Sequence, residues 1–342
     1  MKRINEIDIA RGLAIILIVF GHTINHSIHC NIVFKILYSF HVALFFIISG
    51  YICNTKKNYL IFVKNKICRL LIPYFVWSIL FLIPYFLFGT NVAKNINVIS
   101  SFNIKELIMN ILYGNGNLNA LKQNSSLWFL PALFSMELIY YWIVKLSESW
   151  RTTIKIMLMA FLILISIVSN CYIKFVMPFG INTVLTMGTY YYLGYLLKKE
   201  NIIHFLSNKY YIIPLLLIGI VFSIINDGVQ PIDYQYGNIS LSLISGMSLS
   251  LLVLLVSFAI KNNKYLIYVG KNTMSILIFH KLIILIFQTK LSILTNLLIN
   301  SNIIIELLLS IIILIISILV SLGIGFIINR ICPLLLGNKK VA

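Results

Sequence analysis

The apolar stretch DIARGLAIILIVFGHT, residues 8–23, is suited to cross a membrane as a helix, yet it contains an arginine and a histidine. Arg11 and His22 are eleven positions apart. At roughly 100° per residue they lie on one helix face, separated by about 16 Å along the axis. Asp8 precedes Arg11 by one turn and is placed to pair with it. Ionisable side chains are costly in lipid, so two on one face predict a functional site. Taken alone, Arg11 could instead snorkel to the interface and His22 could satisfy a buried hydrogen bond.

The composition excludes a soluble protein. The 342 residues are 60% hydrophobic and 11% charged, with a mean hydropathy of +0.97, and a soluble chain needs more polar surface than this. The first apolar segment is longer than a signal-peptide core and lacks a small-residue cleavage site, so we expect a retained membrane helix. The sequence therefore predicts an all-α, polytopic membrane helix bundle that forms one integral-membrane domain over residues 1–342.

The basic residues mark one side of this bundle. Apolar runs predict about ten transmembrane helices, at residues 7–28, 36–53, 70–88, 127–145, 156–173, 181–197, 210–226, 238–260, 272–289 and 303–329. With the N-terminus inside, 19 Lys and Arg residues fall in inner segments and six in outer loops. This bias predicts that both termini are cytoplasmic, in a multi-pass protein of the cell membrane, that is, a bacterial inner or plasma membrane. The net charge of +18 follows this topology and predicts no binding of nucleic acid.

Three further ionisable residues are predicted inside the bundle. His41 lies about five residues inside the outer start of the second helix, at the depth of His22 if the first two helices are antiparallel neighbours. Such a pair suits proton transfer or substrate orientation, and the alternative for His41 is a polar anchor near the lipid headgroups. Glu137 and His280, the latter followed by Lys281, suit either hydrogen bonding between helices or the lining of a site.

The first inner loop carries a concentration of positive charge. NTKKNYLIFVKNKICRLLIPY, residues 54–74, contains five basic residues and no acidic one. Lys66 and Arg69 are three positions apart on a predicted helix, at the same inner level as Arg11. Such a cluster suits the phosphates of a polyanionic cofactor such as coenzyme A. Anionic lipid is the alternative ligand.

The longest outer connection and the cysteines also bear on function. The longest outer connection, residues 89–126, ends in GNGNLNALKQNSS, which suits either an acceptor-facing lid or a solvated linker. The five cysteines are far apart and lack metal-ligand spacing, so neither a disulfide framework nor a metal site is predicted.

Taken in order, these residues resemble the acyltransferase 3 family of integral-membrane acyl-CoA:carbohydrate O-acyltransferases, and within it the fucose 4-O-acetylase-like branch. The R-x₁₀-H pattern of that family falls on Arg11 and His22, and its basic pattern after the second helix falls on Lys66 and Arg69. Three further stretches look familial: YSFHVALFFIISGY (38–51), LWFLPALF (127–134) and GKNTMSILIFH (270–280). Lys66 departs from the pattern, because lysine lacks the planar fork of arginine.

The resemblance implies transfer of an acetyl (acyl) group from cytoplasmic acetyl-CoA to a hydroxyl of an extracytoplasmic or lipid-linked glycan. Arg11, Lys66 and Arg69 would bind the donor, with Arg11 also steadying the thioester. His22 would be the general base, or the carrier in an acetyl-histidine relay. The expected partners are acetyl-CoA, a carbohydrate acceptor and membrane lipid, without a metal.

The same resemblance gives His41, Glu137 and His280 supporting or substrate-binding roles.

Two other functions are alternatives to acyl transfer. A polytopic transporter or glycan flippase would use the intramembrane His, Glu and Arg as a path for protons or substrate. A structural role in envelope assembly would not explain why Arg11 and His22 lie within a membrane helix.

Overall fold

The chain folds into an all-α bundle, as the sequence predicts. The computed structural model describes residues 4–24, 31–83, 104–114, 124–173, 175–206, 209–290 and 303–338. Within them the only strand-like pairing is an isolated bridge between Gln230 and Gln235. The helices are α1 (Asn5–Thr23), α2 (Asn31–Tyr51), α3 (Tyr59–Lys66), α4 (Ile72–Leu80), α6 (Ile104–Tyr113), α7 (Phe129–Ser147), α8 (Thr152–Tyr172), α9 (Ile181–Lys199), α10 (Ile202–Leu206), α11 (Ile212–Ile225), α12 (Ile239–Ile260), α13 (Lys264–Lys271), α14 (Thr273–Lys290) and α16 (Ile303–Ile331). Each predicted apolar run coincides with one of these helices over its described part.

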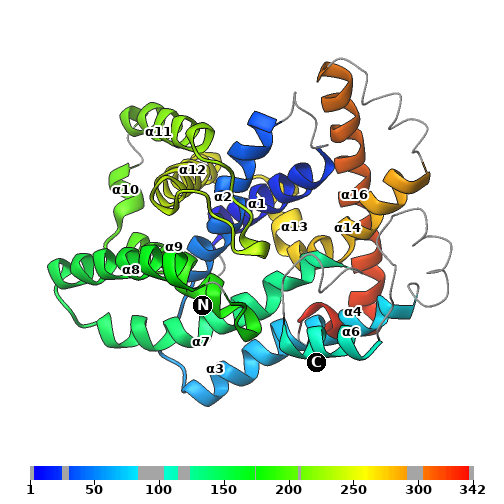
Figure 1. Cartoon of the computed structure of the whole chain (residues 1–342), viewed down its shortest axis with the longest axis horizontal. Helices are drawn as coiled ribbons and strands as arrows, with labels where there is room; N and C mark the ends of the chain where they lie inside the picture. Colours follow the sequence, from blue (N-terminus) through cyan, green and yellow to red (C-terminus); the bar gives the residue numbers. More distant parts are fainter. Residues whose placement is uncertain are drawn as a thin grey trace.

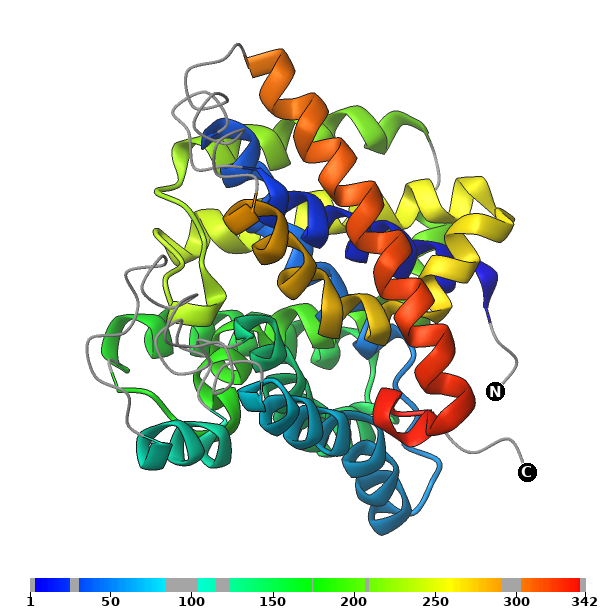
Figure 2. The ribbon, with the colours of Figure 1, turned by 90° about the vertical axis from the view of Figure 1, so that its right-hand side faces the viewer.

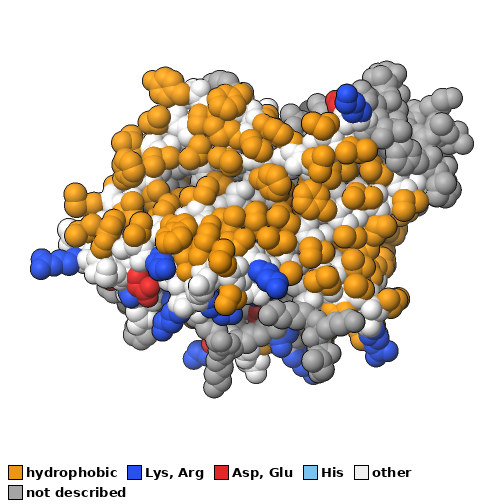
Figure 3. Space-filling view, turned by 90° about the horizontal axis from the view of Figure 1, so that it is seen from below, with side chains coloured by type: hydrophobic (Ala, Val, Ile, Leu, Met, Phe, Trp, Pro, Cys, Tyr) orange, Lys and Arg blue, Asp and Glu red, His pale blue; other side chains and the backbone are white. Residues whose placement is uncertain are grey.

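Much of the surface is apolar. In the described part of the chain, five helices are long and apolar enough to cross a membrane, or six if the bent pair α13 and α14 is one span. α1 is not among these helices, because three charged residues, Glu6, Asp8 and Arg11, lie in its first two turns. In the most apolar 18-residue stretches of α8 and α16, only 22% and 17% of the residues are buried inside the protein. Figure 3 shows a broad apolar face with lysine and arginine side chains along its margin, the distribution expected of a membrane protein.

α1 and α2 lie in the middle of the bundle, between α11 and α12 on one side and α14 and α16 on the other (Figure 1). α2 also packs against α9, and glycines allow these two backbones to approach closely. A Cβ atom on Gly50 would lie 1.8 Å from the carbonyl oxygen of Tyr191, and one on Gly194 would lie 1.9 Å from that of Ile47. Small residues at such crossings are typical of membrane helices, because van der Waals packing drives their association.

The loops predicted to be cytoplasmic meet at one end of the bundle. The hydroxyl of Tyr141, on α7, donates a hydrogen bond to the carbonyl of Lys57 at 2.7 Å. Lys155, at the start of α8, pairs with Glu200, at the end of α9, at 2.7 Å. The two described chain ends also lie on one side of the molecule (Figure 2), as the charge bias predicts.

A sharp break separates α13 from α14. The two helices meet at Asn272 at an angle of 79°. α13 packs on the first turns of α1, where a Cβ atom on Gly270 would lie 1.8 Å from the carbonyl oxygen of Asp8. α14 then runs along α1 and carries His280 and Lys281 to the level of His22.

Candidate functional site

Two cavities lie next to each other inside the bundle. We call the cavity lined by His22 the outer cavity and the cavity lined by Arg11 the inner cavity, after the orientation predicted from the sequence. Their volumes are about 330 Å³ and about 500 Å³. Ile18, Phe129 and Leu277 line both cavities, so these three side chains form the junction between them. Pockets at such helix interfaces are the usual place for a ligand in a helix bundle.

One face of α1 follows both cavities. Asp8, Arg11 and Ile15 line the inner cavity, Ile18 lies at the junction, and His22 lines the outer cavity. The spacing of three or four residues is the helical period, so Arg11 and His22 share the face predicted from the sequence. The predicted ion pair is also present, with Arg11 Nη1 at 3.3 Å from Asp8 Oδ1.

The inner cavity carries an excess of positive charge. Its basic lining residues are Arg11, Lys66, Arg69, Lys198 and Lys271, and its acidic ones are Asp8 and Glu137. The three residues predicted to bind the donor therefore line one cavity. Clustered lysine and arginine side chains in a partly desolvated cavity are suited to bind phosphate groups.

A π-helical turn, Ile67–Leu71, joins α3 to α4 and carries Arg69. Such turns are frequent at functional sites, because the extra residue redirects the side chains that follow it. Lys66, the residue before this turn, extends to Glu137 on α7, with Nζ at 2.6 Å from Oε1. The hydroxyl of Tyr191 donates a hydrogen bond to the other carboxylate oxygen of Glu137 at 3.0 Å.

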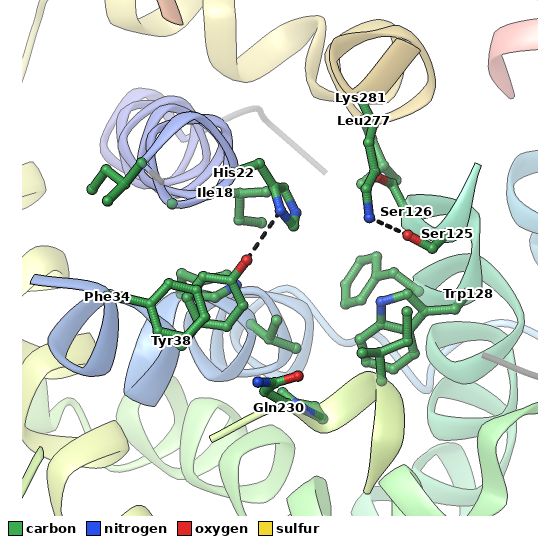
Figure 4. A pocket seen from close by; sticks show the side chains of 17 residues that line it. Ile18, His22, Phe34, Tyr38, Ser125, Ser126, Trp128, Gln230, Leu277 and Lys281 are labelled. Atoms are coloured by element: carbon green, nitrogen blue, oxygen red, sulfur yellow. Dashed lines mark hydrogen bonds between the residues drawn. The ribbon is translucent and has the colours of Figure 1, made fainter. Parts of the chain in front are cut away.

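The outer cavity contains imidazole and phenol groups. The hydroxyl of Tyr38 lies 3.0 Å from Nδ1 of His22 (Figure 4). Tyr38 also packs edge-on against His41, with ring centroids 4.6 Å apart, and stacks on Phe34. His22 and His41 thus line the same cavity, and the ring of Tyr38 contacts both of them. Tyr38 was not predicted as a site residue, although it belongs to the familial stretch that begins YSFH.

His280 is fully buried behind this lining. Its ring stacks on that of His22, with centroids 5.4 Å apart. Its Nδ1 lies 2.6 Å from the carbonyl oxygen of Ile276 and therefore carries a proton, which leaves Nε2 to accept a hydrogen bond from Ser126 at 3.5 Å. His41 makes the equivalent contact to the carbonyl of Leu37 at 2.6 Å. Both imidazoles are therefore oriented by the helix that carries them.

Three further polar groups that were not predicted as site residues, Lys281, Ser125 and Gln230, also line the outer cavity. Lys281 donates a hydrogen bond to the hydroxyl of Ser125 (Figure 4). Ser125 and Ser126 end the polar stretch before α7, so the end of this connection faces the outer cavity; residues 84–103 and 115–123 lie outside the described residues. Gln230 lines the cavity from the loop between α11 and α12. Ser125 and Ser126 could have been predicted as site residues, because they stand directly before the familial stretch LWFLPALF. No sequence pattern indicated Gln230.

Two of the site residues predicted from the sequence, His22 and His41, line the outer cavity, and four line the inner one, namely Arg11, Lys66, Arg69 and Glu137. The buried His280, predicted to bind substrate, lines neither cavity and reaches the site through its contacts with His22 and Ser126. Glu137 is buried, as predicted, but it lies in the inner cavity beside Lys66, apart from His41 and His280. Among the described residues, no group of three or more His, Cys, Asp or Glu side chains is arranged to hold a metal ion.

Comparison with known proteins assigns the chain to one family. The acyltransferase domain of the acyltransferase 3 family matches residues 4–328. The match includes every residue that lines the outer cavity, and all that line the inner cavity except Leu336, Gly337 and Asn338. No curated protein and no solved structure matches the chain. Because the family match covers nearly the whole chain, the protein belongs to the acyltransferase 3 family and is a membrane acyltransferase.

Proposed function

We propose that the protein transfers an acetyl group from cytoplasmic acetyl-CoA to a hydroxyl of an extracytoplasmic or lipid-linked glycan, as in the fucose 4-O-acetylase-like branch. One observation carries the proposal: a cationic cavity and an imidazole-lined cavity meet at Ile18, Phe129 and Leu277. A donor held in the first cavity would present its thioester to a base in the second.

The inner cavity would bind the nucleotide end of the donor. Arg69 and Arg11 present guanidinium groups to the phosphates, and Arg11 also lies on the α1 face that leads to the junction. Lys66 contributes charge, while Glu137 holds it in place through the 2.6 Å ion pair. The pantetheine arm would run along Ile15 and Ile18 towards His22, because these residues continue the same helix face.

His22 would act as the general base. If Nδ1 donates its hydrogen to the Tyr38 oxygen, Nε2 carries the lone pair that takes the proton of the acceptor hydroxyl. The hydroxyl oxygen then attacks the thioester carbonyl carbon. The C–S bond breaks, and the coenzyme A thiolate leaves and takes up the proton that His22 accepted. In the acetyl-histidine variant, Nε2 of His22 attacks the thioester carbon, the C–S bond breaks and the coenzyme A thiolate leaves. The acceptor hydroxyl then attacks the acetyl-imidazole, the C–N bond breaks, and the hydroxyl proton passes to the thiolate.

A glycan acceptor suits the outer cavity, which combines aromatic side chains with hydrogen-bonding groups. Phe34 and Trp128 offer apolar faces, and His41 and Gln230 offer polar contacts. The transport alternative predicts a polar path along the whole bundle. Concentration of the basic side chains in one cavity favours group transfer.

The test uses purified protein in lipid nanodiscs with radiolabelled acetyl-CoA and a panel of glycans, including extracted lipid-linked glycans. We expect label to enter a glycan. His22→Ala should lower the rate by about 10²–10⁴-fold without unfolding the protein. Arg69→Ala should raise the KM for acetyl-CoA, whereas Lys64→Ala, an exposed cation outside the cavity, should not. Normal transfer by His22→Ala, or no acetyl-CoA consumption by the wild type with any acceptor, would contradict the proposal.

A further inference from the structure

The junction between the cavities has a ring of polar side chains one helical turn outside it. Ile18 is followed one turn later by His22 on α1, and Leu277 is followed one turn later by Lys281 on α14. Ser125 precedes Phe129 by the same distance, and its segment enters the bundle in the opposite direction. A group that passes through the junction would therefore meet all three polar side chains at one level.

Lys281 and Ser125 face His22 from the opposite wall of the outer cavity (Figure 4). Among the described residues that line this cavity, Lys281 is the only lysine, arginine or carboxylate. An ammonium group has donors and no acceptor, so the oxygen of Ser125 accepts the hydrogen bond from Lys281. The proton of the Ser125 hydroxyl is then directed to another acceptor, and the neighbouring cation strengthens it as a donor.

We infer that Lys281 and Ser125 form the oxyanion site of the transfer reaction, an inference that rests on the proposed function. Attack by the acceptor oxygen on the thioester carbon moves the carbonyl electron pair onto oxygen and forms a tetrahedral oxyanion. Lys281 and Ser125 donate hydrogen bonds to this oxygen while His22 holds the acceptor proton. When the C–S bond breaks, the pair returns to the carbonyl, and the thiolate leaves with the proton from His22.

The location of Lys281 favours this role over recognition of an anionic acceptor. An acceptor-binding cation is useful anywhere along the cavity wall, whereas an oxyanion donor must lie where the thioester enters. Lys281 lies where the thioester would enter the outer cavity, one turn from the junction residue Leu277 and opposite the base. Donors fixed before the reaction in a desolvated cavity stabilise developing charge more effectively than water does.

The experiment compares full-length variants in nanodiscs, with release of coenzyme A measured in the presence of the acceptor and with water alone. Lys281→Met should lower kcat by about 10²–10³-fold with either acceptor, the range typical for loss of an oxyanion donor. Ser125→Ala should lower kcat by about tenfold, since the ammonium group remains. Lys281→Arg should retain more activity than Lys281→Met, because it keeps the charge. Lys264→Met, which removes an exposed lysine outside both cavities, is the matched control.

Two further measurements separate catalysis from folding and from acceptor binding. The affinity of Lys281→Met for coenzyme A should stay within about twofold of the wild type, because its binding residues lie in the inner cavity. If Lys281→Met does not fold, Ser125→Ala still tests the inference. Unchanged kcat in both variants, or a higher KM for the acceptor alone, would overturn it while the proposed function stands. Failure of the wild type to release coenzyme A would instead reject the proposed function.

Discussion

The Tyr38 hydroxyl lies 3.0 Å from Nδ1 of His22 and thereby orients the imidazole that lines the outer cavity. The two residues come from neighbouring helices, α1 and α2. The contact joins the candidate base to a hydroxyl whose ring packs against both Phe34 and His41.

Tyr38→Phe should lower kcat for acetyl transfer by about tenfold, because the ring of His22 loses the hydrogen bond that orients it. The phenyl ring should keep its stacking on Phe34, so the melting temperature should change little. Steady-state kinetics and thermal unfolding of the variant check both expectations. Tyr265→Phe, at an exposed tyrosine on α13, is the control. Wild-type kcat in Tyr38→Phe would show that this contact is dispensable.

The ion pair between Lys66 and Glu137 should contribute to stability as a coupled unit. Lys66→Met leaves a buried carboxylate without its cation, and Glu137→Gln removes the acceptor of a 2.6 Å contact. Each single variant should therefore unfold at a lower temperature, and the double variant should lose less than the sum. We expect a coupling free energy of roughly 0.5–3 kcal/mol from the double-mutant cycle in denaturant. Additive losses would mean that the two side chains stabilise the protein independently.

Gly50→Ala should destabilise the crossing of α2 and α9, because the new methyl group would lie against the carbonyl of Tyr191. Overpacking of this kind costs roughly 1–3 kcal/mol. Gly323→Ala is the matched control on α16, where no atom lies within 4 Å of the new Cβ. That substitution should leave stability unchanged or raise it by up to about 1 kcal/mol, since alanine favours the helix. Thermal unfolding in detergent distinguishes the two variants, and equal melting temperatures would argue against a tight crossing.

Stability should also depend on the ionisation of Glu200, which lies beyond the end of α9. Hydrogen bonds from Lys155 and Thr152 hold the pKa of this carboxyl below its ordinary value. The stabilisation is therefore present above the unfolded-state pKa of about 4.3 and is lost as the pH falls through the lower folded-state value. Glu200→Gln should lower the melting temperature at pH 7, and the difference from the wild type should shrink in acid. A difference that does not vary with pH would mean that packing, not charge, links α8 to α9 here.

Much of the architecture could be predicted because hydropathy and helical period are local properties of the chain. The predicted runs coincide with observed helices, and Arg11 and His22 share one face of α1 because side-chain direction repeats with the helical turn. The pairing of Arg11 with Asp8 follows from the same period. Lys66 and Arg69 line one cavity for a related reason, although the π-helical turn that carries Arg69 was not predicted.

The division of the site into two cavities could not be predicted, because it depends on how helices that are far apart in the sequence pack together. Nothing in the spacing of Glu137 and His280 shows that one pairs with Lys66 and the other stacks on His22. Likewise, Lys281 reaches Ser125 only because α14 turns by 79° from α13 and runs along α1.

The chain alone therefore determined its membrane bundle and the residue types available for chemistry, because burial in lipid and the helical period act within each segment. The tertiary structure decided which of these residues meet. Contacts across helices arise from backbone approach at glycines such as Gly50 and from the bend at Asn272, and neither can be read from one segment.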